Sequence, residues 1–180
     1  MLAMAVSKWA LDPTHSGVEF SIKHMMISKV KGSFNKFDAT IEADPADLTT
    51  AKIEFTVDLS SVDTNNADRD NHLRSADFFD VETYPQLTFA AKSIVRKSDD
   101  AYAITGDLTM HGVTRTETLT ATFEGTGKDP WGNEKAGFSV EGTLKRSDYG
   151  LTWNAALETG GFLVGDDVKI SADIQAVKQA

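Results

Sequence analysis

Residues 65–85, NNADRDNHLRSADFFDVETYP, form the one stretch of this chain with a clear helical pattern. Asn65 or Asn66 is suited to cap the start of a helix, and two aspartates follow in what would be its first turn. Arg74 would lie near the last turn, so the charges complement the helix dipole. The sequence therefore predicts one short helix at about 66–75, which divides an otherwise β-rich chain into two sets of strands.

On both sides of this helix, apolar residues recur at every second position, which is the period of a β-strand. Residues 18–24 and 53–59 show it most clearly. A phase change near residues 35–36 indicates a β-bulge, and His111-Gly112 is typical of a tight turn. A long loop near 148–163 precedes the last strand. We expect about eight antiparallel strands, the pattern of a sandwich or a closed barrel.

The bulk composition is that of an ordinary globular protein, with 41% hydrophobic and 25% charged residues in 180. We expect a single domain over residues 1–180, in which residues 1–7 are a disordered or tag-like start. The net charge of −9 and the lack of a basic stripe argue against nucleic-acid binding. Without cysteine, the chain has no disulfide and no thiol chemistry.

The compartment is predicted from the first residues, MLAMAVSKWALDP, which lack the basic region of a signal peptide. This pattern favours a cytoplasmic location for the chain as given, or a periplasmic or secreted one if the N-terminus was trimmed. No apolar run approaches the length of a membrane span, so we do not expect a membrane-spanning protein.

The positions expected to face inward contain many small residues, among them Gly32, Gly106 and Ala121. A small barrel filled by its own side chains would need more bulk there, so the pattern favours a container for an apolar ligand. The alternative is that large neighbouring side chains fill the space. The residues predicted to line an apolar tunnel are Phe20, Ile22, Phe34, Phe55, Phe89, Ile104, Leu108, Phe123, Phe138 and Ile170.

Several motifs together resemble the YceI-like polyisoprenoid-binding family, over nearly the whole chain. They are W-x-L-D-P-x-H-S (9–16), V-x-F-x-I-K-H-M (18–25), V-x-G-x-F (30–34), R-D-x-H-L-x-S-x-D-F-F-D (69–80), Y-P (84–85), L-T-M-H-G-V-T (108–114) and V-G-D-D-V (164–168). The resemblance implies a lipocalin-like antiparallel barrel of eight strands, often dimeric. It further implies an elongated apolar tunnel that holds a long isoprenoid or similar amphiphilic chain. Many family members are periplasmic or secreted.

From the residues and this resemblance, we expect a homodimer that binds, sequesters or transports a polyisoprenoid-type lipid, such as an isoprenoid quinone or a polyprenol. We expect no catalysis, no metal and no cofactor other than the lipid. A metal-dependent enzyme is one alternative, since the chain has four histidines, but their spacing gives it no support. The chain also lacks the G-x-S-x-G, P-loop, Rossmann and H-E-x-x-H motifs. A structural interaction module is the other alternative.

Four polar residues are candidates to contact the head group of such a ligand. His24 is in phase with inward-facing apolar residues, although a hydrogen bond to a buried carbonyl would explain it too. Arg69 and His72 share one face of the predicted helix, where an Arg–Asp pair is the alternative. Arg146 is in phase with the apolar face of its strand, so its charge must be paired, reach the rim or meet an anionic head.

A second group of residues is predicted to form a lid or portal, with local packing or a dimer contact as the alternative. Methionine adapts to irregular gaps, and aromatic side chains in a glycine-punctuated loop are suited to cover a tunnel. These residues are Met25, Met26, Tyr149, Trp153 and Phe162.

Overall fold

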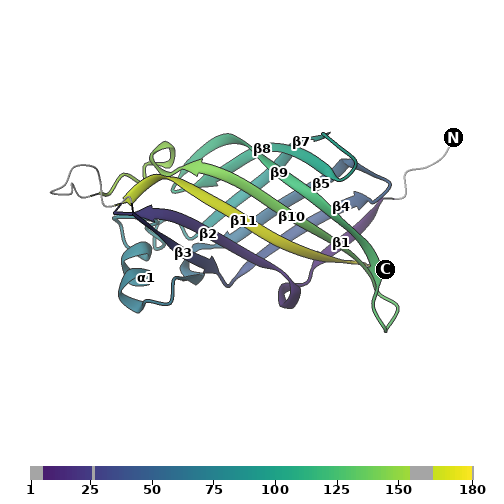
Figure 1. Cartoon of the computed structure of the whole chain (residues 1–180), viewed down its shortest axis with the longest axis horizontal. Helices are drawn as coiled ribbons and strands as arrows, with labels where there is room; N and C mark the ends of the chain where they lie inside the picture. Colours follow the sequence, from purple (N-terminus) through teal and green to yellow (C-terminus); the bar gives the residue numbers. More distant parts are fainter. Residues whose placement is uncertain (1–5, 26, 155–163, 180) are drawn as a thin grey trace.

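A computed structural model of the chain describes residues 6–25, 27–154 and 164–179, and its strands form one antiparallel sheet wrapped into a barrel (Figure 1). The strands are β1 (Ser7–Leu11), β2 (Gly17–His24), β3 (Ser28–Phe34), β4 (Phe37–Asp44), β5 (Asp47–Asp58), β6 (Val62–Asp63), β7 (Gln86–Arg96), β8 (Ala101–Met110), β9 (Val113–Lys128), β10 (Glu134–Lys145) and β11 (Val164–Lys178). The helices are α1 (Ala67–Arg74) and the short 3-10 helices η1 (Pro13–His15), η2 (Leu59–Ser61) and η3 (Arg146–Tyr149).

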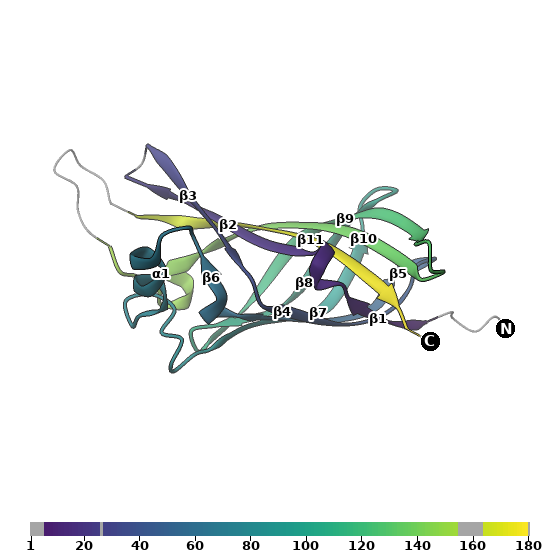
Figure 2. The same ribbon diagram turned by 90° about the horizontal axis from the view of Figure 1, so that it is seen from below.

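The barrel closes because β1 pairs with β4 on one side and with β11 on the other. The closed ring runs β1-β4-β5-β7-β8-β9-β10-β11, so the predicted eight-stranded antiparallel barrel is confirmed. The long strand β11 pairs with β2 through its first part and with β1 through its last residues. Strands β2, β3 and β6 therefore extend the sheet beyond the ring, at the end where α1 lies (Figure 2).

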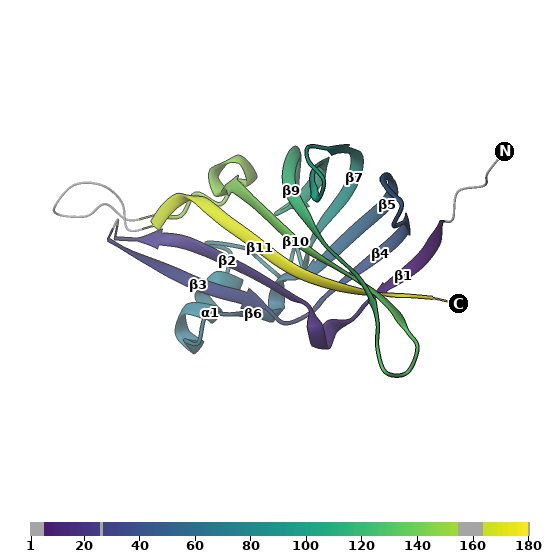
Figure 3. The ribbon, with the colours of Figure 1, turned by 45° about the vertical axis from the view of Figure 1, so that its right-hand side comes forward.

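The two ends of the barrel differ. The end that carries α1, η3 and the β2–β3 turn is called the helix end below. The opposite end carries the start of β1, the end of β11 and the β9–β10 turn, residues 129–133, and is called the terminal end (Figures 1 and 3).

The helix predicted at about 66–75 is confirmed, with Asn66 as its N-cap accepting a hydrogen bond from Arg69 N at 3.0 Å. Hydrogen bonds attach α1 to the barrel, and its Leu73 side chain packs against the core. The buried Asp70 carboxylate accepts from the backbone N and Oγ1 of Thr64 at 2.9 and 2.6 Å. Within the described residues, no helix has the length and apolarity needed to cross a membrane.

The β-bulge predicted near residues 35–36 is wrong, because the chain changes strand partners there. β3 pairs with β2 and β6, whereas β4 pairs with β1 and β5. Between them, Asn35 N donates to Ser61 O, and Asp58 N donates to Lys36 O. The phase change thus marks the point where the strand extension leaves the closed barrel.

Candidate functional site

The interior of the barrel contains two apolar cavities. One, of about 180 Å³, lies within the closed ring of strands and is called the barrel cavity. The other, of about 220 Å³, lies between β2, β3, α1 and the segment that follows β10, and is called the helix-end cavity. Nearly all of the side chains that line the barrel cavity are aliphatic or aromatic, whereas the helix-end cavity has a mainly apolar lining that also includes several polar residues.

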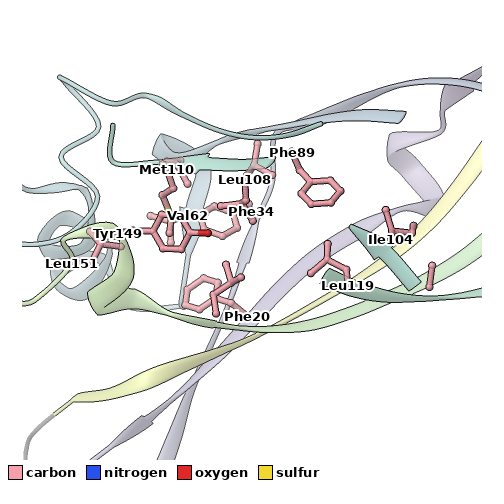
Figure 4. Close-up of a cluster of buried hydrophobic side chains, with 14 residues drawn as sticks. Phe20, Phe34, Val62, Phe89, Ile104, Leu108, Met110, Leu119, Tyr149 and Leu151 are labelled. Carbon is pink, nitrogen blue, oxygen red and sulfur yellow. The ribbon is translucent and has the colours of Figure 1, made fainter. Parts of the chain in front are cut away.

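Phe34, Leu87 and Ile170 line both cavities, so they form the partition between them. The ring of Phe34 is buried in the same cluster as Phe20 and Leu108 (Figure 4), and it also contacts Phe79. Its centroid is 5.3 Å from that of Phe20 and 5.9 Å from that of Phe79. Because edge and tilted contacts at these distances are favourable, the partition is well packed.

The small inward-facing residues were interpreted either as bordering empty space or as making room for large neighbours. Each interpretation holds at some positions. A Cβ on Gly32 would lie 2.5 Å from the Phe20 ring, and one on Gly106 would lie 2.8 Å from the Phe89 ring. These glycines therefore make room for large side chains instead of leaving a void. Alanines, in contrast, do border empty space, and the barrel cavity is lined by Ala39, Ala43, Ala51, Ala121 and Ala172.

The side chains predicted to line a tunnel all contact one of the two cavities, with the exception of Phe123. The barrel cavity is lined by Phe34, Phe55, Phe89, Ile104, Leu108, Phe138 and Ile170. The helix-end cavity is lined by Phe20, Ile22, Phe34 and Ile170. Phe123 packs on Phe138 at 5.2 Å instead, because it lies toward the terminal end, in the apolar cluster around Trp9.

Sequence reasoning missed part of the lining, although the period-2 pattern contained the signal for it. Leu119 and Val140 were already in phase with predicted tunnel residues. The missed apolar lining residues of the barrel cavity include Ile41, Leu48, Ile53, Val57, Leu87, Ile94, Tyr102, Leu119, Val140 and Ile174.

The four residues proposed for a head group all line the helix-end cavity, although they come from β2, α1 and η3. Arg69 uses its Nε and Nη2 to bind Thr64 Oγ1 at 2.8 Å and Thr64 O at 2.7 Å. The Arg–Asp pair considered as its alternative is therefore wrong. Within the described residues, the Nη1 group of Arg69 donates no hydrogen bond to protein. His72 Nε2 lies 3.0 Å from Asp77 Oδ2.

Arg146 is buried and binds backbone carbonyls. Its Nη1 donates to Leu151 O at 2.7 Å and Trp153 O at 2.9 Å, while Nε donates to Gly165 O at 2.7 Å and Nη2 donates to Val164 O at 3.3 Å. A guanidinium has five N–H donors, so backbone acceptors occupy most of them. The structure also corrects its predicted place in a strand, since Arg146 begins η3. It holds the segment after η3 against the start of β11.

Asp166 adds a second link between η3 and β11, because its carboxylate accepts hydrogen bonds from the backbone N and Oγ of Ser147 at 2.9 and 2.8 Å. The hydrogen bonds of Arg146 and Asp166 are together called the clamp. Burial alone would raise the pKa of Asp166. The hydrogen bonds from Ser147 and the charge of Arg146 outweigh burial, so this pKa is lowered. Burial lowers the pKa of Arg146, and the charge of Asp166 opposes that change.

Of the predicted lid and portal residues, Trp153 lies at the helix-end cavity. Its ring centroid is 4.8 Å from that of His72 and 5.3 Å from that of Phe78, so these three rings form one wall. Met25 lies in the β2–β3 turn with 43% of its surface exposed. Met26 and Phe162 lie outside the described residues.

The lid role predicted for Tyr149 is wrong, because its side chain is fully buried. Its hydroxyl donates to Glu117 Oε1 at 2.8 Å, and its backbone carbonyl accepts from His111 Nδ1 at 2.9 Å. Burial, followed by the hydrogen bond to Glu117, raises the pKa of Tyr149. Tyr149 is thus a core residue that anchors η3 to β9 and to the β8–β9 turn.

The four histidines do not converge. His15, in η1, lies within hydrogen-bond distance of Asp12. His24 and His72 line the helix-end cavity from different elements, and His111 lies in the β8–β9 turn. The part of the chain that the structure describes contains no group of three or more metal-ligating side chains placed to hold an ion.

A closed antiparallel barrel with an apolar interior and polar side chains gathered at one end is a lipocalin-like architecture. A family model described as the YceI-like domain matches residues 9–176, and the chain belongs to this family.

The chain is 43% identical to the UPF0312 protein SA2479 of Staphylococcus aureus over 171 residues, which cover 94% of this chain and 97% of that protein. The crystal structure of Burkholderia cenocepacia BcnA matches with a TM-score of 0.81 and 28% identity, over 92% of this chain and 98% of that chain. A domain from Saccharophagus degradans, described as a polyisoprenoid binding domain, matches with a TM-score of 0.67 over 98% of this chain and 100% of that chain. Its identity is 17%, so this last match shows a shared fold.

Proposed function

We propose that this protein binds a long-chain amphiphile of the polyisoprenoid type inside the barrel and sequesters or carries it without catalysis. The observation that carries the proposal is the pair of apolar cavities in sequence along the barrel, with polar groups at one end. The Saccharophagus degradans domain with this fold is described as binding polyisoprenoids, which supports the same ligand class here.

The arrangement of side chains favours one orientation of the ligand. The barrel cavity offers aliphatic and aromatic surface suited to a hydrocarbon tail. The helix-end cavity adds Arg69, His72 and His24, which suit a phenol, quinone or phosphate head. Among these, Arg69 Nη1 is the best-placed donor, because the described protein groups leave it without an acceptor.

Burial of the tail would supply most of the affinity, at about 0.8 kcal/mol for each CH₂ group at most. A long tail needs both cavities, since about 180 Å³ and 220 Å³ are each smaller than the roughly 300–1,000 Å³ of typical ligand pockets. The ligand would therefore displace the Phe34 ring, which lies between them.

Native mass spectrometry of the purified protein, followed by organic extraction, tests this function. We expect one long-chain species per subunit, or uptake of one isoprenoid quinone or polyprenol per subunit by protein that was purified empty. Protein that is empty and takes up neither compound would contradict the proposal. The same spectra measure the predicted homodimer.

Two substitutions inside the barrel sharpen this test. Phe89→Asp and Phe138→Asp place a carboxylate in the barrel cavity and should abolish lipid uptake, because an unpaired charge there disfavours a hydrocarbon tail. Thr120→Ala, at an exposed position of β9, should leave uptake unchanged. Circular dichroism must show that each variant retains its strands. Equal uptake by all three would contradict a binding site in the barrel cavity.

A further inference from the structure

The charge of this acidic protein is unevenly distributed. Residues 20–37 contain Lys23, Lys29, Lys31 and Lys36 and no acidic residue, whereas the whole chain has a net charge of −9. These residues form most of β2, all of β3 and the turn between them. The β2–β3 hairpin is therefore a basic element on an otherwise acidic molecule.

The lysines of this hairpin gather on one exposed face. Lys23 and Lys29 lie directly opposite each other across the two strands, and Lys31 is the next residue of β3 on the same side. Like charges directly opposite each other destabilise a hairpin, so a contribution to the stability of the barrel does not explain why these lysines lie together. Within residues 6–25, 27–154 and 164–179, no ion pair involves these three lysines.

The same hairpin ends in exposed apolar side chains. Ile27 has 84% of its surface exposed and Met25 has 43%. Figure 2 shows the β2–β3 turn projecting from the helix end, beyond the closed ring of strands. Exposed apolar side chains with lysines beside them are the pattern of a segment that lies in a lipid–water interface.

This tip adjoins the helix-end cavity. Ile22, Lys23, His24 and Val30, all from β2 and β3, line that cavity. A surface in contact with the tip would therefore lie beside the end of the barrel that holds the polar lining groups.

We propose that the β2–β3 hairpin docks this protein onto anionic lipid surfaces. Ile27 and Met25 enter the acyl region, and Lys23, Lys29 and Lys31 bind the negatively charged headgroups. The inference deepens the proposed function, because docking would bring the cavity to the bilayer from which a lipid is taken or to which it is delivered.

Co-sedimentation of the full chain with vesicles tests the docking. We expect binding to vesicles of phosphatidylcholine and phosphatidylglycerol in equal parts, and much weaker binding to phosphatidylcholine alone. Binding should weaken as salt is added, because the lysine–headgroup attraction is screened. Equal binding to both vesicle types, or no binding to either, would overturn the proposal.

Matched variants locate the contact. Lys29→Gln with Lys31→Gln should weaken binding about fivefold for each lysine, and Ile27→Asp should weaken it at least about tenfold. The controls lie at the terminal end: Lys97→Gln with Lys128→Gln removes the same charge, and Trp131→Asp changes a side chain that is 83% exposed. Equal losses in the hairpin and control variants would overturn the assignment to the hairpin.

Lipid content measured on the same preparations separates the two proposals. Protein that retains its lipid but does not bind anionic vesicles would refute docking and leave the container function intact. Protein that binds the vesicles through the hairpin but neither contains nor takes up a long-chain lipid would refute the container function while docking stands.

Discussion

The Phe34 side chain forms part of the partition between the two cavities, together with Leu87 and Ile170. It lines both of them, and it is held between Phe20 and Phe79. A side chain in this position limits how long a ligand can be before the ring has to move. Phe34 is therefore expected to influence which chain lengths bind.

Phe34→Ala should join the two cavities and shift ligand preference toward longer or bulkier chains. The truncation should also lower the free energy of unfolding by about 3–5 kcal/mol. Native mass spectrometry with isoprenoid quinones of graded tail length measures the preference. Phe89→Ala is the matched control, since Phe89 is equally buried but lines only the barrel cavity. An identical change in both variants would contradict a special role for Phe34.

Asp12 lies at the junction between β1 and β2, where its charge has several partners. Its carboxylate accepts hydrogen bonds from the backbone N and Oγ1 of Thr14, and it contacts His15 and Lys135. The hydrogen bonds from the Thr14 and His15 side chains lower the pKa of Asp12. Since the folded pKa lies below the unfolded one, the contribution to stability is present at neutral pH and is lost as the pH falls.

Asp12→Asn should lower the melting temperature near neutral pH by about 2–4 °C, the effect of losing about 1 kcal/mol in a domain of this size. The difference from wild type should begin to shrink below about pH 4, the ordinary pKa of an aspartate, because the unfolded wild-type chain then binds a proton that the folded carboxylate, with its lowered pKa, binds only at a lower pH. Thermal unfolding by circular dichroism across this range measures both. A constant difference at every pH would rule out the charge of Asp12 as the cause.

Among the elements, η3 and the start of β11 depend on each other. Neither contains a long apolar run, and they are joined by the Arg146 donors on one side and by the Asp166–Ser147 hydrogen bonds on the other. This clamp also fixes Trp153, whose ring forms part of the helix-end cavity. Loss of the clamp is therefore expected to affect both stability and the cavity.

Arg146→Met should lower the free energy of unfolding by about 3–5 kcal/mol, because several buried carbonyls lose their donor. Arg146→Lys should recover only part of this loss, since an ammonium group cannot reproduce the planar fork. Urea unfolding measures both. The control is Arg115→Met: Arg115 is half exposed, and its ion pair with Asp148 at 3.8 Å should contribute less than about 1 kcal/mol. Equal losses at both positions would contradict the clamp.

On the scale of the whole molecule, closure of the barrel depends on the short strand β1. Trp9, in the middle of β1, is buried, and its Nε1 donates to Ala43 O at 3.3 Å. Together with Ile41, Leu48 and neighbouring alanines it fills the terminal end of the barrel. The proposed ligand would therefore be retained at this end without a separate lid.

Trp9→Ala should lower the free energy of unfolding by about 3–5 kcal/mol and open the terminal end, so that bound lipid dissociates faster. Trp131→Ala is the matched control, because that indole is exposed and its loss should change stability by less than about 0.5 kcal/mol. Urea unfolding and a lipid-transfer assay measure the two effects. Unchanged lipid release from Trp9→Ala would contradict the retention role.

Local sequence was sufficient for most of the strands, for the helix α1 and for the all-β class of this protein, whereas the closed barrel was expected from the family resemblance. The period-2 pattern predicted the strands, Asn66 marked the start of α1, and His111-Gly112 marked a turn in which both residues have positive φ. These features depend on neighbours along the chain, so a single sequence contains the information. The family was predicted because several motifs, in order along the chain, resemble those of a known family.

How these elements form a site depends on contacts that exist only in the folded chain. Three features depend on residues that are far apart in the sequence. They are the division of the interior at Phe34, the position of His24, Arg69, His72 and Arg146 around one cavity, and the burial of Tyr149. A charged residue in a strand pattern does not show whether its partner is a ligand, a carboxylate or a set of carbonyls. The partner of such a residue is determined when β1 pairs with β11 and the barrel closes. Closure determines which side chains face each other and what space remains between them.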